Sequence, residues 1–146
     1  MPAFVKINDF VEDLVNGVHN FSSDTFRLAL SNTDPAAEAS NPTADGNGVL
    51  ANVTQIAYTN LPGAVAPTLD NVSAVLASGT LTFDADDEAI TASGGAANPF
   101  RYVYLYNDTA ANDPLIGYWD YGSSLTLADG ESLTVVFAGA GILTIA

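Results

Sequence analysis

The amino-acid sequence predicts a mainly β fold, an antiparallel β-sandwich or barrel with one N-terminal amphipathic α-helix. Apolar residues recur at spacings of three and four, the helical period, only near the N-terminus. From residue 72 onward the chain consists of short β-prone runs separated by turn residues, which is typical of sandwiches and barrels. With 146 residues, 48% of them apolar and 14% charged, residues 1–146 are expected to form a single folded domain.

The predicted helix spans residues 3–19. Its apolar stripe consists of Phe4, Ile7, Phe10, Val11, Leu14, Val15 and Val18. The acidic side chains Asp9, Glu12 and Asp13 fall on the other side of this helix. We expect the stripe to pack on a sheet of its own subunit or on a neighbouring chain.

Residues 25–146 are expected to be mostly β, with a long surface loop at 32–48 that is rich in Pro, Gly, Asn and Asp. The first strand is predicted at 25–30, residues 49–56 fit either a helical turn or a strand, and 59–71 form a loop or an edge. Further strands are predicted at 72–76, 79–83, 89–92, 100–106, 115–121, 124–127, 133–137 and 142–145. The alternation around Ala-Asp-Gly-Glu predicts a hairpin over 125–137, and a longer hairpin is expected over 100–121.

The charge balance argues against two classes of partner. Three Lys and Arg residues stand against seventeen Asp and Glu, which gives a net charge of −14. Such a chain is repelled by phosphate backbones and by anionic lipid surfaces, so we expect no nucleic-acid partner and no membrane partner. No run of about 18 apolar residues is present, and the N-terminus lacks the basic and apolar regions of a cleaved signal peptide.

The sequence offers few groups for catalysis. It has no cysteine, which excludes disulfides, thiolate metal sites and cysteine nucleophiles. The only histidine, His19, has Ser22, Ser23 and Asp24 nearby, but no nucleophile signature accompanies them. A histidine at the end of a helix more often partners the last carbonyls. We therefore predict no catalytic residue, no cofactor and no enzymatic activity.

An acidic turn raises the question of a metal ion. Asp84, Asp86, Asp87 and Glu88 could supply several oxygens to Ca²⁺. The spacing, however, is not that of an EF-hand, and a solvated turn between two strands explains the cluster equally well. We predict no metal ligand here and leave Ca²⁺ binding at these aspartates open.

The strand FRYVYLY concentrates aromatic side chains. Alternation places Arg101, Val103 and Leu105 on one face and four rings on the other. These rings fit a sandwich core, a protein–protein interface or a sugar-stacking platform. The interface candidates are Phe100, Tyr102, Tyr104, Tyr106 and Trp119, together with Phe4, Phe10 and Val11 from the predicted helix. If the four rings of the strand are buried in the isolated subunit, the interface interpretation fails for them.

The two arginines share a sequence context. Arg27 and Arg101 each follow a phenylalanine in a predicted strand. Because acids greatly outnumber cations, we expect each arginine to pair with a carboxylate and to have a structural role.

Three segments carry a family resemblance. They read FVEDLVNGVHNFSSDTFRLALSNTDP, VLANVTQIAYTNL and FRYVYLYNDTAANDPLIGYWDYGSSLTLADGESLTVVF. With them the chain resembles a widespread group of small virion proteins of tailed bacteriophages. The similarity covers most of the sequence apart from about 34–48 and 62–79. It implies a non-enzymatic component of the particle and brings no catalytic residues with it.

Within a virion, the net charge of −14 favours a place away from the DNA. We therefore expect an outer capsid decoration, or cement, protein on the outer surface of the capsid, in contact with the major capsid protein or another virion protein. A homo-oligomer is expected, with a trimer as one form. The alternatives are a tail, fibre or spike component that contacts the host surface, and a depolymerase that would need paired acids in a cleft.

Overall fold

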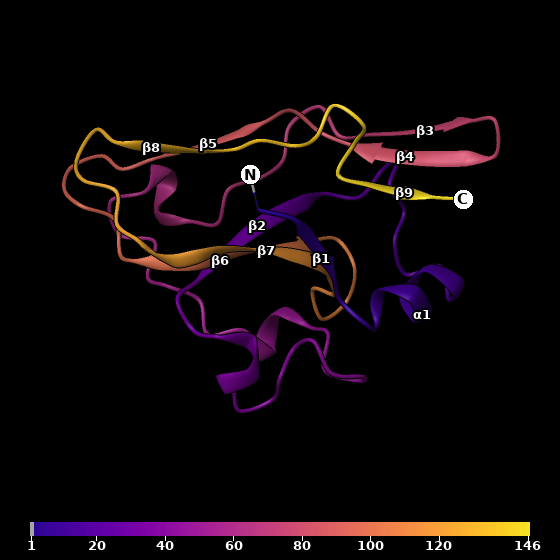
Figure 1. The fold of residues 1–146 in the computed structure, drawn as a ribbon, viewed down its shortest axis with the longest axis horizontal. Helices are drawn as coiled ribbons and strands as arrows, with labels where there is room; N and C mark the ends of the chain where they lie inside the picture. Colours follow the sequence, from indigo (N-terminus) through magenta and orange to yellow (C-terminus); the bar gives the residue numbers. More distant parts are fainter. Residues whose placement is uncertain (1) are drawn as a thin grey trace.

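A four-stranded antiparallel sheet forms the centre of the molecule (Figure 1). The structure is a computed structural model that describes residues 2–146. The strands lie in the order β1 (Phe4–Lys6), β7 (Leu115–Leu125), β6 (Phe100–Asn107) and β2 (Phe26–Ser31). With 37% strand and 10% helix, the protein is mainly β, which confirms the predicted fold class.

Two smaller antiparallel sheets lie along one face of the central sheet (Figure 1). One contains β3 (Ser73–Ala77), β4 (Thr80–Asp84) and β9 (Leu143–Ile145), and the other contains β5 (Glu88–Thr91) and β8 (Ser132–Val135). The main hydrophobic core lies between these layers. Its fully buried members include Phe26, Leu28, Leu30, Phe83, Ile90, Phe100, Val103, Leu105 and Ile116. Burial of these side chains is the main force that holds the sandwich together.

The opposite face of the central sheet is covered by the predicted loop and the residues after it. This segment contains the short 3-10 helices η1 (Pro35–Ala37) and η2 (Leu50–Asn52), and a third, η3 (Pro62–Ala64), follows further along the chain. It encloses a second core of Ile7, Ala29, Val53, Tyr102, Tyr104, Tyr106 and Leu115. The Asp9 carboxylate fixes the loop by accepting hydrogen bonds from the backbone N–H groups of Gly46 (2.8 Å) and Gly48 (2.7 Å). Both faces of the sheet are therefore buried.

The prediction of one helix over residues 3–19 is wrong. Residues Phe4–Lys6 form β1, which pairs with β7 in the register Phe4↔Trp119 and Lys6↔Gly117, and only α1 (Phe10–Val15) is helical. The spacing of apolar residues fits a helix, but pairing with an open edge of the sheet satisfies the backbone groups of this segment and places the Phe4 ring against Trp119.

The predicted aromatic face is also corrected. The pairing of β6 with β7 shifts register between Phe100 and Tyr102, as at a β-bulge, so simple alternation fails there. Phe100 joins the main core with Val103 and Leu105, whereas the tyrosines of β6 point into the second core.

Of the two predicted hairpins, one is confirmed. Strands β6 and β7 pair antiparallel, as expected for residues 100–121. The hairpin over 125–137 is wrong, because β7 runs on to Leu125 and β8 pairs with β5 instead. The turn itself is present: the Glu131 N–H donates to the Ala128 carbonyl (2.9 Å), and the Glu131 carboxylate accepts from the Ala128 N–H (2.8 Å). The turn could be predicted from its local sequence, but the partner of β8 depends on how the sheets pack in the folded protein.

Candidate interaction surface

Six of the eight predicted interface residues lie inside the subunit. Each is at most 4% exposed: Phe10, Phe100, Tyr102, Tyr104, Tyr106 and Trp119. Rings buried to this extent cannot meet a partner on the surface of the folded subunit, and the structure favours the core interpretation for them. For the four rings of β6, the physical reason is that both faces of this strand are covered, one by the small sheets and one by the loop layer.

The other two candidates lie together at the edge of the molecule. Phe4 is half-buried and Val11 is 50% exposed. Both line an apolar groove of about 450 Å³ between β1, α1 and the C-terminal strand β9. We call this the terminal groove; its lining is Phe4, Lys6, Phe10, Val11, Leu14, Leu143, Thr144, Ile145 and Ala146. The groove joins residues from the two ends of the chain.

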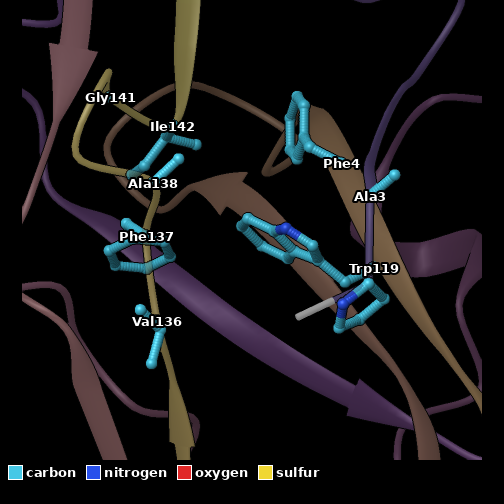
Figure 2. A pocket seen from close by; sticks show the side chains of 9 residues that line it. Ala3, Phe4, Trp119, Val136, Phe137, Ala138, Gly141 and Ile142 are labelled. Carbon is cyan, nitrogen blue, oxygen red and sulfur yellow. The ribbon is translucent and has the colours of Figure 1, made fainter.

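A second hollow lies on the other side of the Phe4 ring (Figure 2). It has a volume of about 280 Å³ and is bounded by β1, β7 and the segment 136–142. The Trp119 ring contacts the rings of Phe4 and Phe137, whose centroids lie 5.0 and 5.7 Å from its own. Phe4 lines both hollows, so the two form one apolar border along the open side of the sandwich.

The sequence explains why this side is open. β1 and β9 are edge strands of different sheets, and each has only three residues. Gly117 lies beside β1, and a Cβ atom there would overlap the Phe4 ring and approach the Val5 carbonyl oxygen to 2.7 Å. Glycine at this position therefore lets β1 dock closely on β7 and fixes the Phe4 ring at the border.

The rim of the terminal groove carries a free positive charge. Arg101 forms a bidentate pair with Asp120 (2.6 and 2.8 Å), and Arg27 forms an ion pair with Asp108 (3.0 Å), as predicted. These hydrogen bonds from Arg101 lower the pKa of Asp120. Lys6, the only lysine, forms no ion pair with any described residue; its Nζ lies 3.5 Å from the Ile7 carbonyl oxygen. An unpaired cation beside an apolar groove suits a partner that brings a carboxylate and apolar side chains.

His19 has a structural environment. Its ring packs between Phe10 and Phe21, with centroids 5.4 and 5.8 Å away. Nδ1 lies 3.2 Å from the Asn107 amide nitrogen, and Asp24 accepts a hydrogen bond from that same amide (2.8 Å). Burial lowers the pKa of His19 to about 4, although the Asp24 carboxylate acts in the opposite direction.

The residues around His19 do not assemble a nucleophile and base. Within residues 2–146, no hydrogen bond joins His19 to Ser22 or Ser23, and the Ser22 N–H instead donates to the Asn20 side chain (3.1 Å). Asp24 is held by the Asn20 backbone N–H (2.8 Å) as well as by Asn107. The group therefore closes a turn and has none of the contacts of a Ser–His–Asp triad.

The acidic turn after β4 is held by local hydrogen bonds. Asp86 accepts from the Asn71 amide (2.6 Å), and Asp87 accepts from the Phe137 N–H (2.8 Å). In the part of the chain that the structure describes, no group of three His, Cys, Asp or Glu side chains is placed to hold a metal ion. Asp84, Asp86 and Asp87 are thus not gathered into one site.

Sequence reasoning identified part of the terminal groove and missed the rest. It selected Phe4, Phe10 and Val11, but for their place on a helix that is much shorter than predicted. It missed Lys6, Leu143 and Ile145. A signal for Lys6 was available, because one lysine inside the apolar string FVKI is unusual in a chain with seventeen acids.

No protein-family model matches the chain, and no curated protein or solved structure matches it either. None of the helices among residues 2–146 has the length and apolar character that crossing a membrane requires. The structure and the sequence are therefore the sources for a functional proposal.

Proposed function

We propose that this chain is a non-enzymatic structural protein of a tailed-bacteriophage virion. In this proposal it is an outer capsid decoration protein that stabilises the head through subunit–subunit contacts. The sequence resemblance points to the virion, and the terminal groove is the observation that supports a contact role. The titratable groups that were candidates for chemistry, His19 and the acidic turn, have structural partners instead.

The terminal groove specifies the chemistry of its partner. Its walls are mostly apolar, and Val11 and Val15 extend the apolar surface along α1, with exposed fractions of 50% and 84%. Covering such a surface removes apolar area from water, which favours association by about 25 cal/mol per Å² before the costs of binding. Lys6 at the rim adds selectivity for a surface that presents a carboxylate. The proposed occupant is a loop or strand end of the major capsid protein.

The overall charge supports a position on the outside of the head. A chain with a net charge of −14 gains nothing from contact with packaged DNA. The acidic residues lie at least partly exposed on the surface, whereas the groove and the segment 71–83 provide contact areas without an acidic side chain.

The copy number of the chain in purified particles tests this proposal. Heads are separated from tails, and the chain is quantified against the major capsid protein by mass spectrometry with labelled peptides. A capsid decoration protein is expected in heads at a copy number comparable to that of the major capsid protein. A few copies per particle, recovered only with tails, would reject the capsid role and favour a tail, fibre or spike component.

A further inference from the structure

The hairpin of β3 and β4 has an unprotected outer edge. Strand β3 pairs with β4 alone, and in Figure 1 the hairpin extends past the end of the central sheet. Two apolar side chains near its tip are exposed, Val75 at 58% and Leu76 at 69%. Alternation places them on opposite faces of the strand, so the apolar surface wraps around the edge.

The turn geometry identifies which backbone groups are free. Ser78 and Gly79 join Ala77 to Thr80 with φ values of 51° and 84°, as a two-residue type I′ turn requires. In such a hairpin the residues next to the turn are hydrogen-bonded to each other, and bonded positions alternate along the ladder. The N–H and C=O groups of Ala74 and Leu76 therefore point outward. No hydrogen bond to another described segment takes them up.

The other sheet edges are covered, short or charged. The edge of β2 is bonded to loops, through the Leu28 N–H to the Pro67 carbonyl and the Ile56 N–H to the Leu30 carbonyl (2.9 Å each). β1 and β9 have three residues each, β5 begins with a glutamate, and β8 has four residues and directly follows Glu131. Free strand edges normally carry a lysine, a proline, a bulge or a cover that prevents pairing. β3 has none of these features, which indicates that its free edge pairs with another strand.

The charge distribution favours a second copy of this chain as the partner of the β3 edge. Residues 71–83 contain no charged side chain, although the protein carries a net charge of −14 and two copies repel each other over most of their surface. We propose that two subunits associate by antiparallel pairing of their β3 strands around a two-fold axis. Full overlap of Ser73–Ala77 with itself places Val75 opposite Val75 of the second copy and pairs Ala74 with Leu76. The outward N–H and C=O groups of both strands then bond to each other.

The proposed pairing creates one continuous six-stranded sheet in the dimer. An interface of this kind is self-complementary, because the same residues serve on both sides. Two five-residue strands bury less area than the roughly 1,200–2,000 Å² of a standard interface, so we expect a reversible dimer. The inference makes the homo-oligomer two-fold and not three-fold, and it does not depend on the chain being a virion protein.

Sedimentation velocity over a range of concentrations tests the dimer. The wild-type protein is expected to shift from monomer to dimer, and Leu76→Lys should weaken the association at least tenfold. Val65→Lys is the matched control, since Val65 is 52% exposed in a loop and the substitution changes the net charge equally. Thermal unfolding of both variants checks that the fold is kept. A monomer at every concentration, or equal weakening by Val65→Lys, would overturn the proposal.

Cysteine cross-linking tests the register. The chain has no cysteine, so an introduced thiol is the only one present. Residues opposite each other at a non-hydrogen-bonded position have Cα atoms about 4.5 Å apart, which a disulfide can span. Val75→Cys is expected to form a reducible covalent dimer at least tenfold faster than Val65→Cys. Equal rates for the two variants, or cross-linking only when another protein is added, would contradict pairing between two copies.

Discussion

At the scale of single residues, the side chains that attracted chemical interpretations are held in structural contacts. His19 is the clearest case, because its side chain is fully buried among phenylalanine rings and its Nε2 has no hydrogen-bond partner among residues 2–146. A charged imidazole would lose its hydration there. The Asp13 carboxylate lies 3.9 Å from Nε2, too far to replace that hydration with a hydrogen bond. The folded protein therefore prefers the neutral form.

This preference predicts a pH dependence of stability. The pKa of His19 is about 4 in the folded protein, below its ordinary value of 6.5, so the folded state binds fewer protons than the unfolded chain. Its contribution is fully present above pH 6.5 and is lost as the pH falls toward about 4. We expect a loss of about 2 kcal/mol in the free energy of unfolding over this range, with allowance for partial screening. Chemical denaturation at several pH values measures it.

A variant without the titrating ring provides the control for this pH dependence. His19→Gln retains a hydrogen-bonding group for Asn107 but does not titrate. As the pH falls, the free energy of unfolding should therefore decrease more for the wild-type protein than for the variant. Parallel curves for the two proteins would show that His19 is not responsible.

At the scale of elements, the sequence predicted strands well and their partners less well. Most strands lie within a few residues of their expected positions, because short runs bounded by turn residues carry the information locally. Three errors share one cause. The identity of Phe4–Lys6, the face of Phe100 and the partner of β8 are each decided by contacts with segments far away in the chain.

The same distinction explains what could be predicted of the candidate site. Phe4 and Val11 were identified from their apolar character, but the terminal groove exists only because β9, near the other end of the sequence, lies beside α1 and β1. No local pattern joins Leu143 to Phe4. The burial of the tyrosines of β6 also depended on a distant segment, the loop layer that covers the outer face of the central sheet.

The docking of β1 gives a prediction at this scale. In Gly117→Ala the new methyl group would overlap the Phe4 ring, so β1 must move away from β7. We expect the free energy of unfolding to fall by about 1–3 kcal/mol, as for other overpacked sites, and Trp119 fluorescence to report greater exposure. Gly139→Ala is the control, because a Cβ atom there meets no atom of the described residues within 4 Å. An unchanged stability in Gly117→Ala would show that β1 is not fixed by this close approach.

At the scale of the whole molecule, the protein combines an acidic exterior with two contact areas that contain no acidic side chain. The net charge of −14 makes copies repel each other over most of their surface, while the terminal groove and the edge of β3 offer places where apolar surface can be covered. In the proposed function the groove binds the capsid and β3 links neighbouring copies. The two surfaces consist of different residues, so a substitution can disrupt one surface and leave the other intact.

The thermal stability of heads tests the central claim most directly. Heads lacking the chain are mixed with purified wild-type protein, Val11→Glu or Val65→Glu, and the temperature of DNA release is followed with a DNA-binding dye. Val11 and Val65 are 50% and 52% exposed, so the two variants differ mainly in whether the new charge lies in the terminal groove. We predict that wild type and Val65→Glu raise the release temperature and that Val11→Glu fails to do so. The same release temperature with and without bound wild-type protein would contradict a stabilising role on the capsid.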